Sequence, residues 1–273
     1  MEREINVLYI NKQKPDKEIL DRIAEIKNFP EWKQAEFNDT KVIRQCFDRL
    51  PKEYIRKSLL LEQHYLCAYC MKRIHDDPFY TTIEHWFPLS KDKERALDYN
   101  NMSGVCKGGS SVKLAERNKR ELCCDAYKGD EEITINPLNQ EHMKLIKYTK
   151  DGKIYTSDPT LDDDIKKKLR LNGVFNLDGS FKCDTSTGLV KGRRDAYQKS
   201  IVMIHVLAKK GKLTSSALRK QIEKIEKEEM MVEFAGVVIF FLKKKCKTLE
   251  KQGLLSVHIS SNCSGNIYFA GRK

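Results

Sequence analysis

Apolar residues recur at helical spacing in the first part of the chain. An amphipathic helix is expected over residues 15–27, where Pro15 marks the start and three isoleucines share one face. These are Ile19, Ile23 and Ile26. A second helical stretch covers residues 41–63, and we expect Pro51 to interrupt it and restart it as a first-turn proline. The pattern therefore predicts a mainly helical N-terminal region over residues 1–63.

Between residues 66 and 138 the helical pattern is lost. Short strand-like pieces, such as TTI at residues 81–83, alternate with glycine, asparagine and cysteine. Five of the nine cysteines lie here: Cys67, Cys70, Cys106, Cys123 and Cys124. Irregular segments bury little apolar surface, so we expect a bound metal ion to stabilise this middle region, residues 64–140.

The C-terminal region, residues 141–273, returns to a mainly helical pattern. It opens with a hairpin signal at residues 148–156, whose turn is an Asp-Gly pair. Leu218, Ile222 and Ile225 lie at helical spacing, and the apolar run at residues 234–242 is typical of a buried helix. We expect residues 254–260, LLSVHIS, to form a strand. The chain as a whole is predicted to have an α+β fold.

Composition narrows the class of protein. With 40% hydrophobic and 33% charged residues, the chain is typical of a soluble globular protein. The apolar run at residues 234–242 is far shorter than the ~20 residues that a membrane helix needs, and the charged N-terminus does not resemble a signal peptide. An odd number of cysteines without an export signal argues against disulfides. We therefore expect a cytoplasmic protein with no membrane partner.

The net charge of +12 is unevenly distributed. Residues 1–140 hold 24 Lys+Arg against 24 Asp+Glu, so the other 27 and 15 place the whole excess in residues 141–273. A basic surface favours a polyanion partner, with nucleic acid first among the candidates. A solvated lysine-rich helix face would account for the charge equally well.

The cysteines have the spacing of a metal site. Cys67 and Cys70, in CAYC, can grip one ion from a tight turn, and Cys106 with either Cys123 or Cys124 would complete a tetrahedral zinc site. A redox CxxC motif and buried free thiols are the alternatives. A site with four protein ligands is closed and structural, so any chemistry must lie elsewhere.

A second set of polar residues is interleaved with these cysteines: Glu84, His85, Asn101, Asp125 and Lys128. Taken singly, each has an ordinary explanation. A histidine beside a tryptophan is often structural, an aspartate after a cysteine can cap a helix, and an asparagine in a loop often forms a turn.

Taken in order, these residues resemble the HNH endonuclease family. The matching motifs are CxxC at Cys67 and Cys70, Glu-His-x-x-Pro ending at Pro88, Asn-Met-x-x-x-Cys from Asn101 to Cys106, and Cys-Asp-x-x-Lys from Cys124 to Lys128. The resemblance is strongest to PtuB, the HNH nuclease subunit of Septu and of some retron anti-phage systems. It implies a ββα-metal nuclease core with a structural zinc site, flanked by helical regions. It also implies a partner ATPase resembling PtuA.

Two departures from the family pattern fall in one place. Cys106 and Cys124 are separated by 17 residues where the family has a short turn. Asp125 stands where HNH proteins often have His or Asn, although aspartate is a good ligand for a hard cation. The family pattern nonetheless makes Cys124 the expected fourth zinc ligand, because the last cysteine directly precedes the metal-binding residue.

The resemblance assigns a role to each residue of the second set. Glu84 and Asp125 would hold catalytic Mg²⁺ or Mn²⁺, and His85 would activate water as a general base. Asn101 would fix the loop that holds His85. Lys128 would contact a phosphate, or would be a solvated helix residue. Glu84 and His85 fall on the first strand, which Pro88 cannot continue.

Basic residues after Cys106 would lie beside this site and grip a substrate strand. They are Lys107, Lys113, Arg117, Lys119 and Arg120. The function expected from the sequence is a metal-dependent endonuclease of antiviral defence that acts on DNA. Two alternatives stay open: a zinc-stabilised nucleic-acid-binding module without catalysis, and an HNH nuclease that cleaves RNA, such as tRNA.

Overall fold

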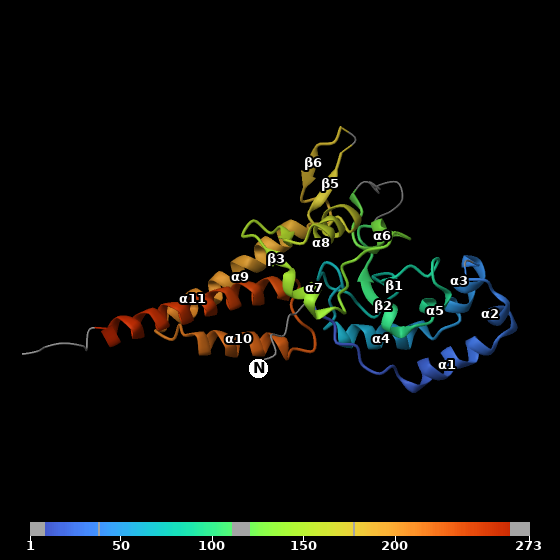
Figure 1. The fold of residues 1–273 in the computed structure, drawn as a ribbon, viewed down its shortest axis with the longest axis horizontal. Coiled ribbons are helices and arrows are strands. Elements are labelled where there is room, and N and C mark those ends of the chain that lie inside the picture. Colours follow the sequence, from blue (N-terminus) through green and yellow to red (C-terminus); the bar gives the residue numbers. More distant parts are fainter. Residues whose placement is uncertain (1–8, 38, 111–120, 177, 263–273) are drawn as a thin grey trace, which may run out of the picture.

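Helices and short hairpins make up the protein. The computed structural model describes residues 9–37, 39–110, 121–176 and 178–262. Within this part of the chain, the structure contains helices and three two-stranded antiparallel sheets (Figure 1). The expected α+β fold is therefore confirmed, while the division into three regions stays a prediction.

The N-terminal region forms a layer of helices. Its members are α1 (Lys17–Asn28), α2 (Pro30–Gln34), α3 (Thr40–Asp48) and α4 (Lys52–Glu62). The two expected helical stretches are present, and Ile19, Ile26 and Ile43 are fully buried in the apolar core of this layer. Pro51 does separate α3 from α4. It lies at the N-cap of α4, however, and not within its first turn.

A hairpin links this layer to the rest of the molecule. Strand β1 (Thr81–His85) pairs antiparallel with β2 (Met102–Cys106), so that His85 lies opposite Met102. The two faces of this hairpin pack against different apolar cores. Met102 belongs to the N-terminal core, and Val105 belongs to the core shared with the C-terminal helices. Because neighbouring strand residues point to opposite faces, Glu84 and His85 face different cores. The elements between and after the strands are α5 (Lys93–Ala96), η1 (Tyr99–Asn101) and α6 (Asp125–Lys128).

Small elements come after the hairpin. The turn signal at residues 148–156 is confirmed, since β3 (Lys147–Tyr148) pairs antiparallel with β4 (Ile154–Tyr155). Asp164 is completely buried in the π-helical turn η3, where its side chain accepts hydrogen bonds from the backbone N–H groups of Thr134 and Ile135. These bonds tie the middle of the chain to its C-terminal part. The remaining elements are α7 (Gln140–Leu145), α8 (Pro159–Asp163), η3 (Asp164–Lys168), β5 (Gly173–Phe175) and β6 (Phe181–Cys183).

Three long helices end the described chain. Helices α9 (Leu189–Lys209), α10 (Ser215–Glu226) and α11 (Ala235–Asn262) lie side by side and extend away from the hairpins (Figure 1). As expected, Leu218, Ile222 and Ile225 are buried, and most of the run at residues 234–242 is buried at the start of α11. Among the described residues, no helix combines the length and apolar character that crossing a bilayer requires.

The prediction of a strand at residues 254–260 is wrong. This segment continues helix α11. Its valine and isoleucine favour strands, but strand propensity is a weak preference that depends on a neighbouring strand. The described residues place no strand next to this segment. Continuing the helix satisfies its backbone hydrogen bonds locally.

Candidate functional site

Four cysteine sulfurs form one cluster. The Sγ atoms of Cys67, Cys70, Cys106 and Cys124 all lie within 4.8 Å of one another, with Cys70 and Cys106 3.6 Å apart and Cys106 and Cys124 3.9 Å apart. A tetrahedral zinc ion with Zn–S bonds of about 2.3 Å holds its sulfurs about 3.8 Å apart. The cluster therefore fits a four-coordinate metal ion such as zinc, and its fourth member is Cys124.

Three segments bring these sulfurs together. The turn after Cys67 is closed by Met71, whose φ of +63° lets its N–H reach the Cys67 carbonyl at 3.0 Å. Ala68 donates to the carbonyl of Gly104 on β2 at 3.1 Å, which ties the turn to the strand that ends at Cys106. Cys124 is the N-cap residue of α6. The start of this helix is therefore attached directly to the cluster.

The cluster also has the electrostatics of a metal site. Hydrogen bonds from the surrounding thiols, Cys123 first and Cys124 next, lower the pKa of Cys106, while hydrogen bonds with Cys106 first and Cys123 next raise the pKa of Cys124. A lowered thiol pKa favours metal ligation, because metal binding releases thiol protons.

Two carboxyl groups, one buried and one half-buried, meet beside the cluster. Glu84 on β1 is 6% exposed, and its side chain contacts that of Asp125 at the start of α6. Burial, followed by the charge of Asp125, raises the pKa of Glu84 well above its usual range. Two carboxylates this close are unfavourable unless a proton or a cation lies between them. Their oxygen atoms suit a hard divalent cation better than zinc.

Lys128 supplies a cation to this pair. Its ammonium lies 2.7 Å from Oε1 of Glu84 and also donates to the carbonyls of His85 (3.2 Å) and Gly129 (3.3 Å). The side chain is 1% exposed, so the alternative of a solvated helix residue is wrong. An ammonium has three donors, and all three are used here. This arrangement does not favour the predicted contact between Lys128 and a phosphate.

His85 faces the opposite side of the strand. It is 4% exposed, its Nε2 lies 3.0 Å from the carbonyl oxygen of Ala96, and its ring packs edge-on against Phe47 at 4.5 Å between centroids. Donation from Nε2–H leaves the lone pair on Nδ1. Burial, helped by the charges of Lys52 and Arg44, lowers the pKa of His85 to about 4, so the ring is neutral at pH 7.

Asn101 holds the segment that comes directly after His85. Its Oδ1 accepts from the backbone N–H of Phe87 at 2.8 Å, and its Nδ2 donates to the carbonyls of Phe87 at 2.9 Å and Arg95 at 3.1 Å. Its own carbonyl accepts from the N–H of Trp86. Asn101 thus connects the end of β1 with α5, which carries the carbonyl that contacts His85.

Sequence reasoning missed two groups around this site. Tyr69, inside CAYC, is buried and donates to Oε1 of Glu84 at 3.2 Å. Phe47, from the N-terminal layer, packs against His85, and the charge of Lys52 helps to lower the pKa of His85. An aromatic residue between two metal-binding cysteines was a usable signal. Nothing in the sequence pattern connects α3 or α4 with His85.

The predicted basic loop is largely outside the described residues. Lys107 is half-buried directly after Cys106. The other four members, Lys113, Arg117, Lys119 and Arg120, lie in the segment 111–120, which the structure does not describe.

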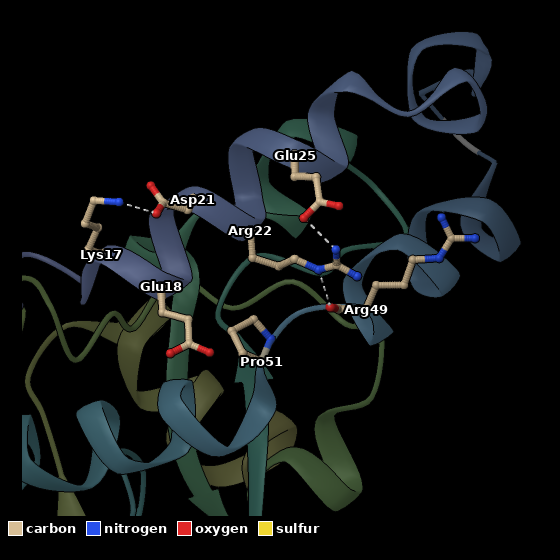
Figure 2. A pocket seen from close by; sticks show the side chains of 7 residues that line it. All are labelled: Lys17, Glu18, Asp21, Arg22, Glu25, Arg49 and Pro51. Carbon is tan, nitrogen blue, oxygen red and sulfur yellow. Dashed lines mark hydrogen bonds and ion pairs between the residues drawn. The ribbon is translucent and has the colours of Figure 1, made fainter.

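A polar pocket of about 540 Å³ lies elsewhere, between α1 and the α3–α4 junction (Figure 2). Its charged groups bind one another. Arg22 pairs with Glu25 at 2.6 Å and donates to the Arg49 carbonyl, while Lys17 pairs with Asp21 at 2.5 Å. The pocket contains none of the candidate site residues, and we assign it no role.

Comparison with known proteins gives one distant relationship. No family model matches the chain. The chain is 25% identical over 114 residues to the Septu protein PtuB of Bacillus thuringiensis, a match that covers 41% of this chain and 40% of that protein's length. This similarity points to a protein related to the Septu defence system. The chain matches less than half of the relative's length.

Proposed function

We propose that the chain is a metal-dependent endonuclease of the HNH type, an effector of a Septu-like defence system that hydrolyses phosphodiester bonds in DNA. One observation carries this proposal. The buried carboxyl group of Glu84 meets the half-buried carboxyl group of Asp125, and His85 follows Glu84 on the opposite face of the same strand. Neither apolar packing nor a structural zinc site requires a pair of carboxylates at this position.

The donor sets suit two different ions. Cys67, Cys70, Cys106 and Cys124 would hold structural Zn²⁺, and Glu84 with Asp125 would hold Mg²⁺ or Mn²⁺. A divalent ion at the carboxylates would supply positive charge that stabilises the phosphate as its charge develops. Tyr69 and Lys128 both bind Oε1 of Glu84 and so orient this carboxylate.

His85 would provide the base. With Nε2–H bound to the Ala96 carbonyl, Nδ1 accepts a proton from water, the water oxygen bonds to phosphorus, and the bond from phosphorus to the leaving 3′ oxygen breaks. The leaving oxygen takes a proton from solvent. A phosphate anion next to the ring favours its protonated form, which counteracts the low pKa of about 4. General-base assistance of this kind typically contributes about 10²–10⁴ in rate.

Cleavage assays test the proposal. Plasmid DNA is incubated with the protein and Mg²⁺ or Mn²⁺, with and without a PtuA-like ATPase subunit, which we propose as the cytoplasmic partner. The wild-type protein should cleave, and His85→Ala should not. Equal cleavage by the two would remove His85 from the mechanism. Matched RNA and tRNA substrates in the same assay decide between DNA and RNA, because attack by water does not need the 2′-hydroxyl.

A binding module without catalysis is the second candidate. Two observations favour it: the ammonium of Lys128 already neutralises Glu84, and His85 is almost completely buried. This alternative predicts salt-sensitive nucleic-acid binding and no cleavage with any divalent metal. Binding without cleavage in the presence of the ATPase would favour it over the nuclease.

A further inference from the structure

We infer that the outward face of helix α9 is a docking surface for an acidic helix of a partner protein. The inference goes beyond the proposed function, because no residue of this face belongs to the candidate site. It also gives a use to part of the positive charge that residues 141–273 carry.

The second half of α9 is apolar but is not buried. Seven of the eight residues from 201 to 208, IVMIHVLA, are apolar, and none of the eight is buried. Val202 and Val206, one helical turn apart, are 60% and 44% exposed. Valine forms helices less well than alanine, lysine or glutamate, so an exposed helix position gains nothing from valine unless another group packs on it. The stretch therefore has the character of a surface that a partner covers.

The position of α9 in the fold leaves this face open. Helix α11 lies between α9 and α10 and packs against both, so α9 forms one edge of the layer (Figure 1). Met203, Ile204 and Leu207 are half-buried and pack against the apolar core that the C-terminal helices share. Val202 and Val206 lie on the outer face, where no element of the described chain covers them.

Exposed cations lie on the same outer face at both ends of the apolar stretch. They are Lys191, Arg194, Lys199, Lys209 and Lys210. Within the described part of the chain, the side chains of these five residues make no ion pair. Asp195 is the one acidic residue of α9. At a rise of 1.5 Å per residue, Lys199 and Lys209 are about 15 Å apart along the helix, with both valines between them.

Charge complementarity selects the occupant of this face. A second copy of the chain would bring like charges together, and the segment 263–273 contains two basic residues and no acidic one. A nucleic acid would pair with the cations but would gain nothing from the valines. A lipid surface calls for Trp, Phe or Leu, which the exposed positions of α9 lack. A protein helix with apolar residues one turn apart, and with Asp or Glu about 15 Å apart on either side of them, matches both the valines and the cations.

Binding of a synthetic peptide tests the inference. The probe is a labelled helical peptide of about 20 residues, with leucines one turn apart at its centre and glutamates near both ends. A scrambled peptide of the same composition is the control. Fluorescence anisotropy with the full chain should show saturable binding of the probe that weakens as salt is added. The scrambled peptide should bind at least about 10-fold more weakly, because it keeps the charge and loses the pattern.

Substitutions on the outer face locate the binding site. Val202→Glu places a negative charge in the apolar centre of the face and should weaken binding of the probe by about 10-fold or more. Lys199→Gln and Lys209→Gln should each weaken it by about 2–5-fold and reduce its salt dependence. The matched controls are Val232→Glu and Lys224→Gln, because both residues are exposed and lie outside α9. These controls should bind like the wild type.

Other occupants of this face are outcomes of the same test. Equal binding of the probe and the scrambled peptide would overturn the inference, as would wild-type affinity in Val202→Glu. A short DNA duplex, phosphatidylserine vesicles or a second copy of the chain would each replace the acidic helix if Val202→Glu abolished that association and not peptide binding. Thermal melting separates loss of the surface from loss of the fold, and the exposed Lys199 provides a second test. Peptide binding is measured without cleavage, so its result does not depend on the proposed nuclease.

Discussion

The cysteine cluster and the carboxylate pair are neighbours built from the same segments, yet their chemistry differs. The cluster brings four like ligands within 4.8 Å of one another, close enough to share one ion. The pair brings only two carboxylates together, and a lysine neutralises one of them. A closed set of four ligands stabilises structure, whereas two ligands leave positions for water and substrate. The comparison therefore separates the proposed structural site from the proposed reactive one.

The position of the carboxylate pair depends on the cysteine cluster, and we do not expect the reverse dependence. Tyr69, which binds Glu84, lies between two cysteines of the cluster, and Asp125 comes directly after Cys124. We therefore expect disruption of the cluster to displace both carboxylates. We expect changes at the carboxylates to leave the four sulfurs in place.

Breaking the cluster should have the largest effect. Cys70→Ser removes one of four zinc ligands, and structural zinc contributes about 10 kcal/mol or more to folding in small metal-dependent domains. We expect the melting temperature to fall by more than about 10 °C, with loss of bound zinc and of cleavage. Circular dichroism and elemental analysis provide the measurements. Cys183→Ser, an exposed cysteine outside the cluster, is the control. Full zinc content and normal melting in Cys70→Ser would reject a structural metal site.

Changing the carboxylate pair should separate activity from zinc binding. Glu84→Gln keeps the size of the side chain but removes a metal ligand, so cleavage should fall by about 100-fold or more. Zinc content should stay near the wild-type value, whereas the melting temperature should fall, because the buried ammonium of Lys128 loses its carboxylate partner. Asp130→Asn, an exposed acid just beyond α6, should cleave normally. Wild-type cleavage by Glu84→Gln would show that the reaction does not use this carboxylate.

A smaller effect is expected at the residue that connects the two sites. Tyr69→Phe removes one of the two hydrogen bonds to Oε1 of Glu84, which should raise the Mg²⁺ concentration for half-maximal cleavage by about 10-fold. Stability should fall by about 1 kcal/mol. Urea unfolding and metal titration measure the two effects. Tyr54→Phe, at an exposed position, controls for hydroxyl loss in general. An unchanged metal dependence would restrict Tyr69 to a packing role.

The smallest change should be a gain in stability at Lys52. Burial lowers the pKa of Lys52 from 10.5 to about 6, so the unfolded chain binds one more proton between these two pH values. Wild-type stability should therefore rise with pH across this window, and the lysine should be most destabilising below about pH 6. Lys52→Met should be about 1–2 kcal/mol more stable there, with the gain shrinking toward pH 10. Urea unfolding at pH 5.5, 7 and 9 tests this; a gain independent of pH would contradict it.

Much of the secondary structure around the candidate site could be predicted from the ordered motifs. Their resemblance to the HNH family correctly placed Glu84 and His85 on one strand, Cys106 on the next, and Asp125 on a helix. Such motifs are informative because each is local, and a turn, a strand end or a helix start is defined by few residues. The segment 254–260 failed for the opposite reason, since a strand requires a partner that local sequence does not reveal.

The sequence by itself determined the ligand types, the order of the elements and the alternation that sends Glu84 and His85 to opposite faces of β1. Only the tertiary structure decided what those faces meet. Lys128 is directed into the carboxylate pair, and Phe47 packs against His85 from a helix more than thirty residues earlier in the chain. Burial and long-range electrostatics depend on which distant segments pack together, and these contacts set the pKa values and hydrogen bonds on which the chemistry depends.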